Sequence, residues 1–103
     1  MNKQYTLRYL PLFDKDLTEA VNYIAVTLQD PISAEQLVDE VEAAIEKRRE
    51  MPKAFAPYPS EKPRKYPYYR ISVKNYLVFY VVIGNVMEVR RFLHSRRNID
   101  KLL

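Results

Sequence analysis

Five side chains near the C-terminus can hold an anion or handle a proton. They are Arg90, Arg91, His94, Arg96 and Arg97, which fall within eight residues of one another. Guanidinium groups bind the oxygens of phosphates and carboxylates, and an imidazole can act as a general acid or base near neutral pH. The pattern predicts an anion-binding site that could also transfer protons. The alternative is an ordinary charged surface in contact with water.

The alternation of a β-strand would divide these side chains between two faces. Arg91 and Leu93 would share one face, and Arg90, Phe92 and His94 would share the other. We therefore predict that the two adjacent arginines diverge and that one of them points to solvent. The other should join His94 in a cleft for anions at the open side of the sheet.

The elements that carry these residues begin with a strand and two helices. Residues 5–9 alternate between apolar or aromatic and polar side chains, which is typical of a strand with one buried face. Apolar residues then recur at spacings of three and four over residues 13–28 and 34–48, which predicts two amphipathic helices in an antiparallel hairpin. Ser33 with Gln36 matches a capping box at the start of the second helix.

A long loop and three strands follow. Residues 52–67 contain five of the seven prolines among several cations, a density that excludes a helix or a strand ladder. Strands are predicted at 69–73, 76–82 and 86–93, joined by two-residue turns, the second of which holds Gly84, the only glycine. The middle strand is apolar throughout and should be covered on both faces.

Together these elements predict the fold class. We expect a single α+β domain over residues 1–103, with an N-terminal strand and an antiparallel helical hairpin packed on an antiparallel sheet. A three-stranded C-terminal meander completes that sheet, and residues 95–103 form a terminal helical turn or a tail. A chain of 103 residues is too short for two independent cores.

Composition excludes several classes of protein. The longest apolar run, Tyr76 to Ile83, is far shorter than the roughly 18 to 20 residues that a bilayer crossing requires. Nothing at the N-terminus resembles a secretory signal, so we expect a cytoplasmic protein that does not enter membranes. With no cysteine and one histidine, neither a disulfide framework nor a metal site is expected, and no motif calls for a cofactor.

The two halves of the chain carry opposite net charges. Residues 1–47 hold 4 Lys and Arg against 9 Asp and Glu, whereas residues 48–103 hold 13 against 4. The net charges are therefore −5 and +9. A basic half of this kind attracts phosphates or an acidic protein partner, and its field would raise encounter rates at low salt.

Three stretches of the sequence carry a family resemblance. YTLRYLPLFDKDLTEAVNYI, DPISAEQLVDEVEAAIEKRREMP and NYLVFYVVIGNVMEVRRFLHSRRNIDKLL resemble, in this order, the opening strand and first helix, the second helix, and the terminal hairpin of the RelE/ParE superfamily. These are small toxins of bacterial type II toxin–antitoxin pairs. The resemblance implies a toxin that arrests growth and is neutralised by a small acidic cognate antitoxin.

Two branches of this superfamily attack different targets. ParE-like toxins inhibit DNA gyrase, whereas RelE-like toxins are metal-independent endoribonucleases that cut messenger RNA on the ribosome. For RNA cleavage, the resemblance assigns Arg70 and Arg97 to the phosphate and His94 to proton transfer. Leu77 and Leu103, however, stand where the nucleases carry an arginine and a tyrosine. These departures favour gyrase as the target, with the ribosome and its messenger RNA as the alternative.

The resemblance and the charge together predict a binding surface. Its candidate residues for target or antitoxin are Lys62, Arg64, Lys65, Arg70, Arg90, Arg91, Arg96 and Arg97. Tyr58, Tyr66 and Tyr68 lie in or beside the basic loop and are the tyrosines most suited to contact a partner. The prediction depends on the meander gathering these cations, with His94, into a single recess.

Overall fold

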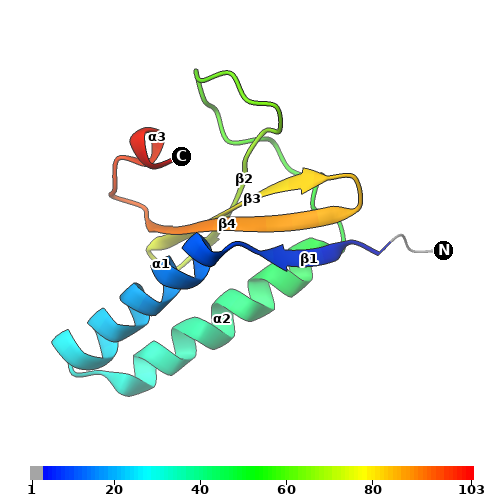
Figure 1. Ribbon diagram of the computed structural model, residues 1–103. Helices are drawn as coiled ribbons and strands as arrows, with labels where there is room; N and C mark the ends of the chain where they lie inside the picture. Colours follow the sequence, from blue (N-terminus) through cyan, green and yellow to red (C-terminus); the bar gives the residue numbers. More distant parts are fainter. Residues whose placement is uncertain (1–3) are drawn as a thin grey trace.

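The computed structural model describes residues 4–103. Its elements in chain order are β1 (Thr6–Tyr9), α1 (Pro11–Asn22), the π-helical segment η1 (Tyr23–Thr27), α2 (Pro31–Arg49), β2 (Tyr69–Val73), β3 (Tyr76–Ile83), β4 (Val86–His94) and α3 (Ile99–Leu102). Figure 1 shows α1 and α2 as a hairpin under one face of the sheet. The loop before β2 and the short α3 lie on the other side.

The four strands form one sheet in the order β1-β4-β3-β2. β2, β3 and β4 pair antiparallel as the predicted meander, so the α+β class, the helical hairpin and the meander are confirmed. β1, however, runs parallel to β4, with Thr6 beside Val86 and Tyr9 beside Val89, and the sheet is therefore mixed. The alternation of side chains identifies a strand but not its partner, so the sequence could not reveal this direction.

The larger core fills the space between the hairpin and the sheet, on what we call the helix face. It is made by Phe13, Leu37, Val41, Ile45, Tyr69, Ile71, Val73, Val78, Tyr80, Met87, Val89 and Phe92. The buried positions of α2 recur at helical spacing, and those of β2 alternate, as the sequence predicted.

A second, smaller core lies on the opposite side, which we call the loop face. Its buried residues are Tyr68, Phe79, Val81, Leu93 and Ile99, and the partly buried Tyr58, Tyr66, Leu102 and Leu103 pack against it. Residues 52–67 contain no helix or strand, as predicted. They nevertheless cover this face together with α3, and β3 is buried on both sides.

The helical hairpin differs from the sequence prediction in two details. α1 continues into η1, where the Leu28 N–H donates to the Tyr23 carbonyl five residues back, at 3.0 Å. The predicted Ser33–Gln36 capping box is wrong, because α2 begins earlier: Asp30 is the N-cap and accepts from the backbone N–H of Ser33 at 3.1 Å. Within residues 4–103, neither helix has the length and apolarity to cross a bilayer.

The turn between β3 and β4 confirms the predicted use of the only glycine. Gly84 has φ +60°, and a methyl group added there would meet no atom within 4 Å. The left-handed backbone conformation of Gly84, and not a lack of space, therefore disfavours a larger residue at this position. We expect Gly84→Ala to lower the free energy of unfolding by about 1 kcal/mol, because the left-handed conformation costs an L-residue this much.

The matched variant for this turn is Gly84→Asn, since asparagine tolerates the left-handed region better than alanine. Urea unfolding of the two variants should show a smaller loss for asparagine. Equal losses would mean that the strain does not come from the backbone conformation.

Candidate functional site

An extra residue in β4 changes the alternation that the sequence suggested. Arg91 lies opposite Phe79 and Val89 opposite Tyr80, so Arg90 has no partner on β3 and forms a β-bulge. Val89 packs into the helix-face core, and Phe79 belongs to the loop-face core. The bulge thus lets two consecutive residues, Arg90 and Arg91, leave the strand on the same side.

The two arginines accordingly meet instead of diverging. Both line a cavity of about 220 Å³ that also contains Tyr68, Leu102 and Leu103. Their side chains are 29% and 15% exposed, so neither points freely to solvent. The predicted divergence of the two arginines is wrong because the bulge places both on one side of the sheet. The alternation of side chains in the sequence does not reveal such a bulge.

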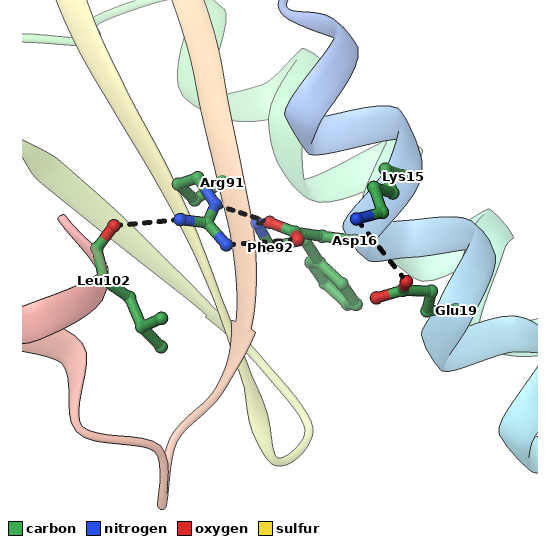
Figure 2. Close-up of polar contacts among 6 residues, drawn as sticks. All are labelled: Lys15, Asp16, Glu19, Arg91, Phe92 and Leu102. Atoms are coloured by element: carbon green, nitrogen blue, oxygen red, sulfur yellow. Dashed lines mark hydrogen bonds and ion pairs between the residues drawn. The ribbon is translucent and has the colours of Figure 1, made fainter.

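Arg91 is held by α1 and by the C-terminal segment. Its Nε and Nη2 donate to the two carboxylate oxygens of Asp16 at 2.7 and 3.2 Å, and its Nη1 donates to the Leu102 carbonyl at 2.8 Å. Asp16 also accepts from the backbone N–H of Phe92 at 3.0 Å. Figure 2 shows this guanidinium between the Leu102 carbonyl and the Asp16 carboxylate. Arg91 therefore joins three parts of the fold.

Arg90 belongs to a second ion-pair network on the loop face. The buried carboxylate of Glu88 accepts from Arg90 Nε and from Arg8 Nε, each at 2.8 Å. Burial alone would raise the pKa of Glu88, but the hydrogen bonds and charges of Arg90 and Arg8 outweigh it and lower that pKa below its ordinary value. Arg90 also donates to the Tyr68 hydroxyl at 3.5 Å.

Two cations of the basic loop hold the C-terminal segment. Lys62 Nζ donates to the Asp100 carbonyl at 2.6 Å, and Arg64 Nη1 donates to the Leu103 carbonyl at 3.3 Å. The guanidinium carbon of Arg64 also lies 4.8 Å from the centre of the Tyr68 ring. Lys65, by contrast, is exposed, and its nearest aromatic contact is the Tyr66 ring at 5.6 Å.

Arg70 is exposed on the loop face. Its position opposite Phe79 puts it on that side of β2, and its guanidinium carbon lies 5.1 Å from the centre of the Tyr58 ring. Tyr58 packs edge-on against Phe79 at 5.3 Å and donates to Asp100 at 3.2 Å. The tyrosines of the loop, predicted as partner contacts, thus serve at least partly to pack it onto the sheet.

His94 and Arg97 lie elsewhere, at the end of the sheet where α1 passes β4. They line a cavity of about 500 Å³, which we call the end cavity. Its other polar residues are Asp16, Glu19, Tyr23 and Tyr76. Tyr76 stacks on Phe92 with ring centres 4.7 Å apart and meets His94 edge-on at 5.2 Å. His94 therefore belongs to the helix-face side of the sheet.

One nitrogen of His94 is already engaged. Its Nδ1 accepts from the backbone N–H of Arg96 at 3.1 Å, and its carbonyl accepts from the backbone N–H of Arg97 at 3.0 Å. A neutral imidazole whose Nδ1 is an acceptor carries its proton on Nε2. His94 can thus offer a ligand an N–H donor, while its side chain also shapes the turn after β4.

The predicted single recess is not formed. Arg91 and Arg90 are committed to Asp16 and Glu88, Arg70 stands on the loop face, and His94 with Arg97 lines the end cavity on the other side. Arg96 is exposed in the turn beyond β4. The structure therefore brings together His94 and Arg97, and separately Arg90 and Arg91, but not the whole set.

Comparison with known protein families assigns the chain to one of them. The family described as the ParE toxin of the type II toxin–antitoxin system parDE matches residues 7–99. The chain belongs to this family. It is a ParE-family toxin, as the three quoted stretches indicated. No significantly similar sequence was found among curated proteins.

Two solved structures share the fold of this ParE-family toxin. One, of the chromosomal ParDE toxin–antitoxin system from P. aeruginosa, is 18% identical with a TM-score of 0.72, and the match covers 88% of this chain and 96% of that one. The other, the DinJ–YafQ toxin–antitoxin complex of E. coli, is 11% identical with a TM-score of 0.53, covering 90% and 94%. At these identities the likeness concerns the fold alone.

Several residues that line the sites of this ParE-family toxin were not predicted from its sequence. Asp16 and Glu19 of α1 and Tyr23 of η1 supply one side of the end cavity, yet nothing in the sequence separates these two acids from Asp14 on the same helix. Glu88 did leave a signal, because it is the one charged residue among the first four of an apolar strand. A buried charge requires partners, and Arg8 and Arg90 are those partners.

Proposed function

We propose that this chain is a cytoplasmic toxin that arrests growth by inhibiting DNA gyrase and is neutralised by a small acidic cognate antitoxin. Membership of the ParE family over residues 7–99 supports the toxin class. The choice of gyrase over messenger RNA rests on how the structure distributes the residues that RNA cleavage would need.

Cleavage of RNA through its 2′-hydroxyl requires proton transfer and cations at one phosphate. The candidates for these roles are Arg70, His94 and Arg97. Arg70 lies on the loop face beside Tyr58, whereas His94 and Arg97 lie in the end cavity on the helix-face side. Because the sheet separates them, they do not converge on one phosphate, and this observation favours inhibition by binding.

The cations whose charged groups remain available suggest where a partner binds. Arg90 and Arg91 are paired with Glu88 and Asp16, and Lys62 and Arg64 hold the C-terminal carbonyls. Among the proposed target- or antitoxin-binding cations, this leaves Lys65, Arg70, Arg96 and Arg97. The committed cations would act by shaping the surface and contributing to its field.

The test incubates the purified chain with gyrase and relaxed plasmid, and separately with ribosomes programmed with messenger RNA. We expect loss of supercoiling and accumulation of cleaved plasmid, with the messenger intact. In growing cells, DNA damage and filamentation should precede any fall in protein synthesis. A chain premixed with its antitoxin is the control and should leave gyrase fully active.

The opposite pattern would contradict the proposal. Messenger cleaved on the ribosome with unaffected gyrase would assign the chain to the ribonuclease branch despite its family. A chain that affects neither preparation and arrests no host would be an inactive relative that binds only its antitoxin.

A further inference from the structure

The end cavity differs from the other charged regions of the molecule because several of its hydrogen-bond donors have no partner within residues 4–103. Of its two carboxylates, Asp16 is engaged within the chain and Glu19 is exposed. Both oxygens of Asp16 accept from Arg91, and one of them also from the Phe92 N–H. Glu19 is largely exposed, and its Oε2 lies 4.0 Å from Lys15 Nζ. Figure 2 shows both pairs. Asp16 is thus satisfied within the chain, whereas Glu19 faces solvent.

Several hydrogen-bond donors of the cavity have no acceptor among residues 4–103. Over residues 4–103, the side chains of Arg97, Tyr23 and Tyr76 have no hydrogen-bond or ion-pair partner, and His94 uses only Nδ1. Burial, and then the nearby Tyr23, raises the pKa of Tyr76, so its hydroxyl keeps its proton at neutral pH. Four donor side chains with unused N–H or O–H groups therefore line one cavity, an arrangement that suits an oxyanion.

The π-helical segment η1 begins at a residue of this cavity. Tyr23 is the first residue of η1, and its carbonyl accepts the Leu28 N–H across five residues. Single π-helical turns inside helices occur frequently at functional sites. Here the segment begins at the residue that completes the cavity opposite Tyr76 and His94.

We propose that the end cavity binds a carboxylate side chain presented by an apolar segment of a partner protein. Arg97 would supply the charge, and His94 Nε2–H with the hydroxyls of Tyr23 and Tyr76 would supply neutral donors. The apolar lining of Ala20, Phe92 and Leu93 suits aliphatic neighbours of that carboxylate. This inference goes beyond the proposed function, because it applies whichever target the toxin attacks.

Charge favours a peptide carboxylate over the backbone of a nucleic acid. Asp16 and Glu19 line the same cavity. A single carboxylate bound at Arg97 brings only one negative charge to the cavity. A polyanion would bring its neighbouring phosphates against Asp16 and Glu19, which is unfavourable.

The test is an NMR titration of the full chain, followed through the ring signals of His94, Tyr23 and Tyr76. The probe is acetyl-Leu-Glu-Leu-amide, and its matched control is acetyl-Leu-Gln-Leu-amide. We expect saturable shifts with the glutamate peptide and much weaker binding of the glutamine peptide. Arg97→Ala should weaken the glutamate peptide at least about tenfold, the usual effect of losing a charge-assisted hydrogen bond.

Lys101→Ala is the matched protein control, since it removes an equal charge from an exposed residue near the C-terminus, outside the cavity lining. It should leave affinity within about twofold, as expected of a screened surface charge. Arg97 and Lys101 are both exposed, so both variants should fold, which the NMR spectra themselves report. The proposal is overturned by absence of shifts, by equal binding of the two peptides, by equal effects of the two variants, or by tighter binding of uridine monophosphate than of the glutamate peptide.

Discussion

Asp16→Ala is expected to lower the free energy of unfolding by about 3 kcal/mol. Asp16 is only 9% exposed and accepts three hydrogen bonds, two from Arg91 and one from the backbone N–H of Phe92. Alanine would leave a largely buried guanidinium unpaired and a strand N–H unsatisfied, and both losses cost free energy. Chemical denaturation of the purified chain measures the change.

The position of Asp16 explains why the effect should be large. β1 pairs with β4 only as far as Val89, so the edge of β4 beyond that residue has no strand beside it. The Asp16 carboxylate reaches this free edge from α1 and binds Phe92, while holding Arg91 against the Leu102 carbonyl. One side chain thus connects helix, sheet and C-terminal segment.

Asp14→Ala is the control for this prediction. Asp14 carries the same charge on the same helix but is exposed, and it makes no ion pair within residues 4–103. Its replacement should change stability by less than about 0.5 kcal/mol. Equal losses for the two variants would show that the charge of α1 matters and the contacts of Asp16 do not.

The sequence predicted the elements of this fold because local patterns determine them. The helical spacing of α2, the apolar length of β3 and the glycine of the β3–β4 turn each reflect interactions within a few residues. The parallel pairing of β1 and the role of Asp30 as helix cap were missed. The first depends on a strand eighty positions along the chain, and the second on a choice between Asp30 and Ser33, two polar residues three positions apart.

The candidate site was less predictable than the fold, and the bulge at Arg90 shows why. A one-residue insertion in strand pairing leaves no trace in hydrophobic alternation, yet it moved Arg90 to the face of Arg91. Charge composition likewise showed that the second half of the chain is basic. It did not show which of its cations form hydrogen bonds and ion pairs within the fold. Arg91 and Lys62 turned out to stabilise the C-terminal segment.

Glu88→Gln is expected to lower the free energy of unfolding by about 2 kcal/mol at neutral pH. The Glu88 side chain is 8% exposed and accepts hydrogen bonds from Arg8 and Arg90. Glutamine has no negative charge and therefore cannot balance the charges of these two arginines. Arg8 is half exposed, so solvent screens its share of the loss. The partly buried Arg90 carries most of the effect.

The same variant has a defined pH dependence. Because Arg90 and Arg8 lower the pKa of Glu88 in the folded chain, the carboxylate stabilises the fold fully above its unfolded pKa of 4.5. That stabilisation is lost as the pH falls through the lower folded pKa. The stability difference between the wild-type chain and Glu88→Gln should therefore be constant from neutral pH down to about pH 5 and shrink below it.

Glu61→Gln provides the comparison for both measurements. Glu61 is exposed in the basic loop and has no ion pair within the described part of the chain. Its variant should match the wild-type stability throughout the same pH range. If the Glu88→Gln difference stayed constant down to pH 3, the ion pairs with Arg8 and Arg90 could not be its source, because protonation removes the charge on which both pairs depend.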